Sequence, residues 1–96
     1  MAVTKSELIA RLNTRFPDLA PKDMDAFVAT ILNELSDALI AGDRIELRGF
    51  GAFSVRKREP RMARNPKNGE TVKVAERYSI YFRAGKELRE KLNSED

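Results

Sequence analysis

The chain reads EPRMARNPKNGETVKVAE from Glu59 to Glu76, a stretch that is basic and poor in apolar side chains. Its sizeable apolar side chains are those of Met62, Val72 and Val74, and Pro60, Pro66 and Gly69 interrupt it. So few apolar groups cannot form a core of their own. We therefore expect residues 59–76 to form a protruding two-stranded ribbon, called the arm below, with its tip at residues 65–69, mobile until something binds it.

Strands are expected on both sides of the arm, because apolar residues alternate there with polar ones. Residues 43–58 hold two such runs, separated by Gly49-Phe50-Gly51, which we expect to form a tight turn. Residues 77–83 form a further strand that returns the chain to the body. The apolar members of these runs are Ile45, Leu47, Phe53, Val55, Tyr78, Ile80 and Phe82.

Three helices complete the pattern. Thr4 and Glu7 have the spacing of a capping box, at the start of a helix that reaches about Arg15. A second helix begins at Pro21, which suits the first turn, and Gly42 is placed to terminate it. A short third helix is expected over residues 84–93.

The second helix carries a wide apolar stripe, more than one short neighbouring helix can cover. Its members are Met24, Phe27, Val28, Ile31, Leu32, Leu35 and Leu39. Because an exposed apolar patch of this kind marks an interface, we expect an intertwined dimer with two arms. The sequence thus predicts a single α+β domain over residues 1–96. Its expected parts are a helical dimerisation part (4–42), a small antiparallel sheet (43–58 and 77–83), the basic arm (59–76) and a C-terminal helix (84–93).

Positive charge is concentrated in one part of the chain. The net charge is +3, but residues 56–86 hold ten basic and three acidic residues, a net charge of +7, which leaves −4 for the rest. This localised field suits a bound polyanion. The alternative is a solvated surface of mixed charge, which the scarcity of acidic residues in this stretch disfavours.

Composition argues against several classes of function. The chain has neither cysteine nor histidine, so the usual zinc sites and the Ser-His and Cys-His nucleophiles cannot be assembled from it. No apolar run approaches the ~20 residues that span a bilayer, and no signal peptide is evident. Gly49-Phe50-Gly51 is too short for a dinucleotide fingerprint. We expect no enzyme, no metal, no cofactor, no small-molecule substrate and no membrane partner.

Three motifs resemble the family of HU and integration host factor, bacterial DNA-bending proteins. They are Arg64-Asn65-Pro66-Lys67-Asn68-Gly69, Gly49-Phe50-Gly51 and Phe82-Arg83-Ala84-Gly85-Lys86-Glu87-Leu88. The resemblance extends over essentially the whole chain. Within the family, residues 44–51 are most similar to the β subunits of integration host factor.

The resemblance implies a role for the arm. Pro66 would enter between base pairs as a wedge, and Arg61 and Arg64 would follow the minor groove. The alternatives are a turn proline and a merely solvated ribbon face. The expected DNA-binding residues of the arm and its base are Arg56, Arg58, Arg61, Arg64, Asn65, Lys67 and Lys73.

The resemblance also implies two groups of residues on the body. Lys5, Ser6, Arg83 and Lys86 would clamp phosphates of the flanking duplex, although lysines near helix ends are common without such a role. Arg44, Glu46 and Arg48, on one face of a strand, would give preference for particular DNA sequences. The alternative for these three is a cross-strand ion-pair ladder that contributes little.

The function implied is architectural: a dimer that binds the minor groove and sharply bends double-stranded DNA in the bacterial nucleoid, in the cytoplasm, assisting recombination, replication and transcription. The partner chain is either an identical copy or a related α-type subunit. Two alternatives stay open, a non-sequence-specific HU-like protein and a basic oligomerisation or RNA-binding module.

Overall fold

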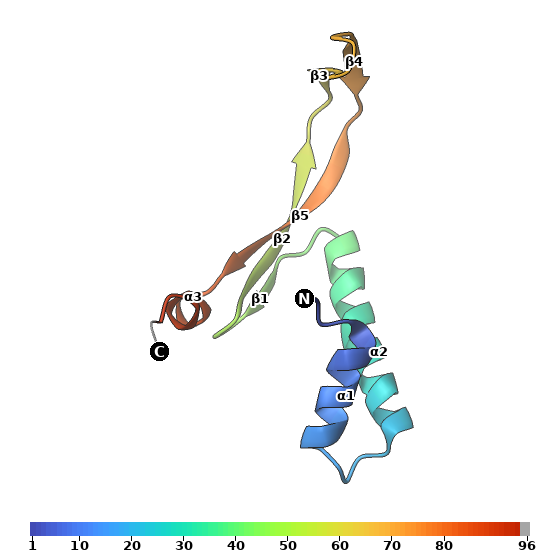
Figure 1. Ribbon diagram of the computed structural model, residues 1–96, viewed down its shortest axis with the longest axis vertical. Coiled ribbons are helices and arrows are strands. Elements are labelled where there is room, and N and C mark those ends of the chain that lie inside the picture. Colours follow the sequence, from blue (N-terminus) through green and yellow to red (C-terminus); the bar gives the residue numbers. More distant parts are fainter. Residues whose placement is uncertain (95–96) are drawn as a thin grey trace. The chain divides into compact units, whose positions relative to one another are not determined.

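A computed structural model describes residues 1–94, and this part of the chain forms three helices and five strands (Figure 1). In chain order they are α1 (Lys5–Arg15), α2 (Pro21–Ile40), β1 (Ile45–Leu47), β2 (Gly51–Arg58), β3 (Arg61–Arg64), β4 (Thr71–Val74), β5 (Arg77–Ala84) and α3 (Lys86–Leu92). The predicted α+β class and order of elements are confirmed. Contacts divide the chain into two compact units, residues 1–37 and the part that begins at Ala38.

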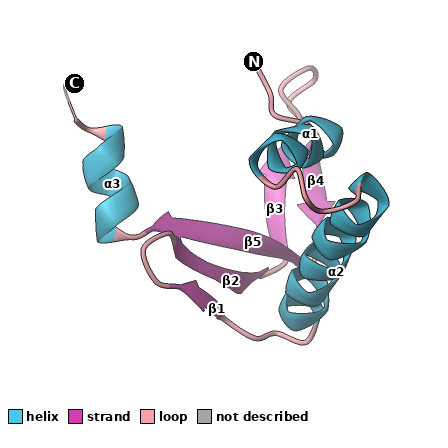
Figure 2. Ribbon diagram, turned by 90° about the horizontal axis from the view of Figure 1, so that it is seen from below, coloured by secondary structure: helices cyan, strands magenta, loops and turns pink. Residues whose placement is uncertain are grey.

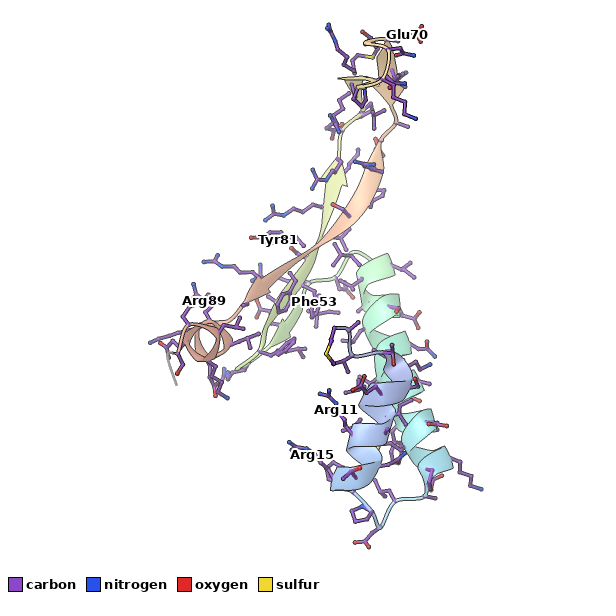
Figure 3. The ribbon with its side chains drawn as sticks, viewed as in Figure 1. Arg11, Arg15, Phe53, Glu70, Tyr81 and Arg89 are labelled. Carbon is purple, nitrogen blue, oxygen red and sulfur yellow. The ribbon has the colours of Figure 1, made fainter. Side chains whose placement is uncertain are left out.

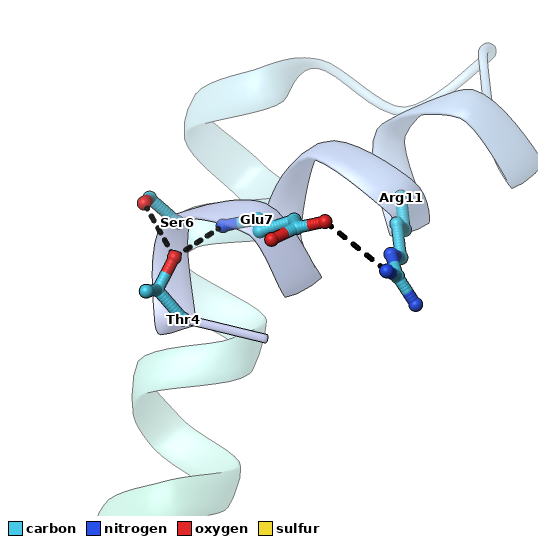
Figure 4. A network of polar contacts seen from close by, with 4 residues as sticks. All are labelled: Thr4, Ser6, Glu7 and Arg11. Atoms are coloured by element: carbon cyan, nitrogen blue, oxygen red, sulfur yellow. Dashed lines mark hydrogen bonds and ion pairs between the residues drawn. The ribbon is translucent and has the colours of Figure 1, made fainter. Parts of the chain in front are cut away.

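Helix α1 begins with half of the predicted capping box. The Thr4 hydroxyl accepts a hydrogen bond from the Glu7 backbone N–H at 3.2 Å, and it also lies 3.2 Å from the Ser6 hydroxyl (Figure 4). The Glu7 carboxylate, which would have closed the box, instead accepts from Arg11 at 3.1 Å. An ion pair one turn along the helix has replaced the bond back to the cap.

Helix α2 begins and ends as predicted, with Pro21 first and Asp23 in the first turn. At its end the N–H of Gly42 donates to Leu39 O at 3.0 Å and that of Asp43 to Ala38 O at 2.9 Å. Gly42 takes the left-handed conformation, φ +87°, that such helix ends favour.

Part of the apolar stripe on α2, at Phe27, Ile31 and Leu32, is exposed in the single chain. Among the large apolar side chains described, only Met24 and Val28 are buried, at 4% and 5% exposure. Phe27 and Ile31 on the same helix are 51% and 58% exposed. The single chain therefore leaves a continuous apolar surface without a cover.

The second unit is built on a three-stranded antiparallel sheet in the order β1–β2–β5 (Figure 2). Strand β2 pairs with β5 along its whole length, from Gly51 opposite Ala84 to Arg58 opposite Arg77. Strand β1 is shorter than the sequence alternation predicts. Arg44 precedes it and Arg48 follows it, in a turn closed by a 2.9 Å bond from the Phe50 N–H to Leu47 O.

Aromatic rings and one backbone bond join that turn to the end of the sheet. The ring of Phe82 packs on Phe53 at 4.7 Å and on Phe50 at 5.4 Å between centroids. The N–H of Gly85 donates to Phe50 O at 2.9 Å. This bond holds Gly85 extended as the N-cap of α3, so the last helix begins at Lys86 and not at the predicted residue 84.

The arm is a two-stranded ribbon, as predicted. Strands β3 and β4 pair antiparallel from Arg61 opposite Val74 to Arg64 opposite Thr71. The ladder between β2 and β5 stops at Arg58 and Arg77, so residues 59–60 and 75–76 interrupt the pairing between sheet and arm. Most side chains of β3 and β4 are exposed, because the ribbon has no core to pack on.

Candidate nucleic-acid interface

The tip of the arm is a closed turn that displays a proline. The Asn65 N–H donates to Glu70 O at 2.7 Å, and the Gly69 N–H donates back to Asn65 O at 2.8 Å. Side-chain oxygens close smaller turns inside it: Asn65 Oδ1 accepts from the Lys67 N–H, and Asn68 Oδ1 from the Glu70 N–H, both at 2.9 Å. Pro66, which has no N–H to satisfy, lies exposed in the turn.

Some tip residues hold the turn together through hydrogen bonds, and others are exposed to solvent. Asn65, predicted to bind DNA, uses its side-chain oxygen to hold the turn. Pro66 and Lys67, which follow it, are exposed. The structural role of Asn68 was not predicted from the sequence, although asparagine side chains commonly close turns of this kind.

The basic side chains of the arm are divided between its two faces. In the register of β3 and β4, Arg64 stands opposite Thr71 and Met62 opposite Lys73, so Arg64 and Lys73 share one face with Met62. Arg61, three residues before Arg64, belongs to the other face. The arm presents positive charge on both faces, and Arg61 and Arg64 do not form one row.

A second basic surface covers one face of β2 and β5. Alternation places Arg56 and Arg58 on the same face as Arg77 and Arg83. The Arg58 Nε donates to the Ser79 hydroxyl at 3.3 Å, and the Arg56 guanidinium lies over the ring of Tyr81. We call this surface the arginine face. Its side chains come from both strands because the pairing has no slip over eight residues.

Lys57 lies on the opposite face, in a cluster of acidic residues at the base of the arm. Its Nζ is 3.2 Å from Glu76 Oε2 and 4.0 Å from Glu59 Oε1. All three side chains are substantially exposed, so the pairs contribute little stability on their own. They neutralise the charge of Lys57, one of the ten basic residues in residues 56–86.

A groove brings together the residues predicted to give sequence preference. It runs beside β1, the β1–β2 turn and the end of β5, and its lining includes Arg44, Glu46, Arg48, Arg83 and Arg89. Arg44 Nε pairs with Glu46 Oε1 at 2.9 Å, with both side chains well exposed. The groove therefore carries a strong net positive charge.

Arg83, expected to clamp phosphates, lines this groove with Arg48, and Arg89 lines it from α3. Arg89 was not among the residues predicted from the sequence. The one sequence feature that pointed to Arg89 was its place on a short helix, three residues after Lys86. Sequence alone did not predict that it lines the groove, because the chain direction at Gly85 determines which face of α3 meets the groove.

The other predicted phosphate-binding residues lie at helix starts. Lys5 and Ser6 are the first two residues of α1, in the first compact unit. Lys86 is the first residue of α3, in the second unit, with its Nζ 4.0 Å from Glu90 Oε1. Open backbone N–H groups at such starts attract anions.

Neither a metal cluster nor a membrane-spanning helix is found within residues 1–94. No group of three or more carboxylate, histidine or cysteine side chains in this part is arranged to hold a metal ion. None of its helices is both long and apolar enough to cross a bilayer.

The chain matches the model of the bacterial DNA-binding protein family over residues 3–93, and it belongs to that family. Its curated relatives include integration host factor subunits β. The subunit of Azoarcus sp. (strain BH72) is 58% identical over 91 residues, covering 95% of this chain and 97% of the relative. That of Dechloromonas aromatica (strain RCB) is 55% identical with the same coverage. The predicted resemblance to HU and integration host factor, and within them to the β subunits, is confirmed.

Solved HU structures share the fold. An HU–DNA cocrystal structure from Anabaena superposes with a TM-score of 0.82 at 33% identity, covering 94% of this chain and 97% of that one. HU from Thermotoga maritima gives a TM-score of 0.63 at 26% identity, covering 94% and 98%. The chain therefore has an HU-like fold.

Proposed function

We propose that this protein is an architectural DNA-binding protein that sharply bends duplex DNA from the minor groove. The observation that carries the proposal is the exposed Pro66 at the tip of a basic ribbon without a core. Minor-groove architectural proteins insert apolar wedges of this kind between base pairs and bend the duplex around the protein. Pro66 supplies a compact wedge, and its missing N–H costs the turn no hydrogen bond.

The basic residues supply affinity for the phosphate backbone. Arg61, Arg64, Lys67 and Lys73 hold the arm on the DNA, and the arginine face receives the bent duplex at the base of the arm. Lys5, Ser6, Arg83 and Lys86 contact phosphates of the flanking duplex beyond the bend. Asn65 contributes to this surface through the turn that it holds.

The active species is a dimer with two arms. The exposed apolar surface of α2, with Phe27 and Ile31 about half exposed, supports an interface that a second chain covers. The partner is either an identical copy or a related α-type subunit. The dimer acts in the nucleoid of the bacterial cytoplasm, where bent DNA assists recombination, replication, transcription and the regulation of gene expression. It carries out no catalysis.

The groove beside β1 gives the protein preference for particular sites. Arg48 lies in the β1–β2 turn without a carboxylate partner among the described residues, whereas Arg44 and Glu46 pair with each other. This arrangement favours Arg48 as the reader of base edges or DNA shape. The second candidate is an HU-like protein without site preference, which the exposed, weak Arg44–Glu46 pair supports.

Arg48→Ala tests the site preference. We expect the ratio of affinities for the best site and for random duplex to fall several-fold, with random-duplex binding changed less, because a base contact is worth about 1–3 kcal/mol and is lost only at the specific site. Titrations of both duplexes measure the ratio. Equal weakening on both would reassign Arg48 to phosphate contact and favour the HU-like function.

A binding comparison tests the central proposal against its rivals. The purified protein is titrated with a linear duplex, the same duplex carrying two nicks, and single-stranded RNA of matched length. We expect the nicked duplex to bind tightest, because its bending energy is already reduced. We also expect log affinity to fall steeply with log salt, reflecting about six to ten phosphate contacts. Tighter binding to RNA, or equal binding to both duplexes, would contradict the proposal.

A further inference from the structure

Two arginines on the arginine face have partners on the neighbouring strand. The Arg56 guanidinium carbon lies 3.8 Å from the centroid of the Tyr81 ring (Tyr81 is labelled in Figure 3). Ser54 stands opposite Tyr81, and Arg56 opposite Ser79, so the arginine and the ring are diagonal neighbours on one face. Arg58 is held in parallel by its 3.3 Å hydrogen bond to Ser79.

The contact with Tyr81 fixes the Arg56 side chain but leaves its donors open. No carboxylate pairs with Arg56 within residues 1–94, and the side chain is exposed. A guanidinium over an aromatic face keeps its charge, and those of its N–H donors that do not face the ring stay open. Arg56 therefore presents open donors from a side chain that the ring helps to hold in place.

We propose that Tyr81 is a positioning residue for DNA binding: its ring holds Arg56 ready to receive a phosphate of the bound duplex. The inference rests on the proposed function and adds a residue to it. A free arginine side chain loses rotamer freedom when it binds, and a side chain already held in place loses less. Tyr81 raises affinity through Arg56 and does not itself contact DNA.

Substitutions at position 81 separate the ring from the hydroxyl. Tyr81→Leu removes the aromatic face without changing charge. We expect it to weaken duplex binding about two- to fivefold, the size of an exposed cation–π contact, and to lower the salt slope by up to about one phosphate contact. Tyr81→Phe keeps the face, so its affinity and slope should match the parent. Equal losses in both variants would overturn the proposal, because the hydroxyl would then matter.

Tyr78→Leu is the matched control. It makes the same change on the same strand, but alternation places Tyr78 on the opposite face, with Lys57 as its pairing partner. Its salt slope should equal that of the parent. Thermal midpoints of all variants show which have folded. A slope lowered equally by Tyr78→Leu and Tyr81→Leu would overturn the proposal in favour of a general effect on the strand.

A double-mutant cycle tests whether Tyr81 acts through Arg56. In an Arg56→Ala background, Tyr81→Leu should cause no further loss of affinity. Arg56→Lys keeps the positive charge, and because position 56 is exposed the variant should fold normally. Its duplex affinity should fall by about as much as that of Tyr81→Leu. A full loss from Tyr81→Leu in the Arg56→Ala background would overturn the positioning role. Duplex binding by the parent that does not depend on salt would instead contradict the proposed function itself.

Discussion

At the scale of single residues, Gly51 and Pro66 differ in how much space their surroundings leave for a side chain. Gly51 is buried where β2 begins, and a Cβ placed there would lie 2.6 Å from Arg83 O and 2.6 Å from Phe82 Cζ. Pro66 lies in the open at the arm tip. The first position tolerates no added atom, and the second places no packing limit on its occupant.

Gly51→Ala should destabilise the fold by about 1–3 kcal/mol, because a backbone oxygen and a packed ring must both move to admit the methyl group. Denaturant unfolding measures the loss. Gly69→Ala is the comparison: no atom blocks a Cβ at that glycine, and although its φ of +74° strains an alanine, this strain falls on an arm that contributes nothing to a core. A loss from Gly51→Ala no larger than that from Gly69→Ala would contradict the steric argument.

Pro66→Ala should leave the fold and the dimer intact and reduce the bend angle of the bound duplex. Unstacking a base step costs about a few kcal/mol, and alanine is a poorer wedge than proline. Energy transfer between dyes at the duplex ends measures the bend. We also expect linear DNA to lose more affinity than DNA with two nicks. A parental bend in the variant would make Pro66 a turn residue only, with exposed Met62 as the next candidate wedge.

At the scale of the element, helices and strands here depend on bonds at their ends. Helix α1 starts where the Thr4 hydroxyl satisfies a backbone donor, and α3 starts where Gly85 bonds to the β1–β2 turn. The arm depends on the turn at residues 65–70, because its strands have no core. End contacts therefore position the surfaces proposed to meet DNA.

Thr4→Ala should destabilise the protein by about 1 kcal/mol, because losing the cap leaves the Glu7 N–H of α1 unsatisfied. Thermal unfolding measures the change. Thr14→Ala is the matched control in the same helix, where the threonine hydroxyl bonds back to Ala10 O at 3.1 Å and alanine is the better helix former. Thr14→Ala should be neutral or slightly stabilising, and equal losses in the two variants would show that the cap is not the cause.

At the scale of the whole molecule, the single chain buries too little to account for its own stability. Within residues 1–94, only Met24 and Val28 of the large apolar side chains are buried, whereas a folded domain relies on a contiguous apolar core. Folding and association are therefore expected to be one process, in which the partner chain supplies the missing core.

The thermal midpoint should rise with protein concentration if folding and dimerisation are coupled. Scans over a hundredfold range of concentration, with mass measured in solution, check this. Ile31→Asp is a second test of the dimer. If Ile31 were simply exposed in a monomer, the substitution would change the free energy of unfolding by no more than about 0.5 kcal/mol. If Ile31 lies in a dimer interface, the loss should be larger. Asn33→Asp adds the same charge outside the apolar stripe. A constant midpoint with a monomer mass, and equal effects of the two substitutions, would contradict the dimer.

Local sequence patterns were enough to predict the elements and much of the candidate site. The period of two around Phe53 and Ile80, the apolar stripe of α2 and the punctuation of the arm each depend on neighbours along the chain. The turn that displays Pro66 is likewise local, since all its hydrogen bonds lie within residues 65–70.

Contacts between distant segments settled the rest. Eight residues of uninterrupted pairing between β2 and β5 brought Arg56 onto Tyr81, and the bond from Gly85 to Phe50 brought Arg89 to the groove beside Arg48. Charge and periodicity along a chain say which groups are present, whereas strand register and packing determine which of them meet.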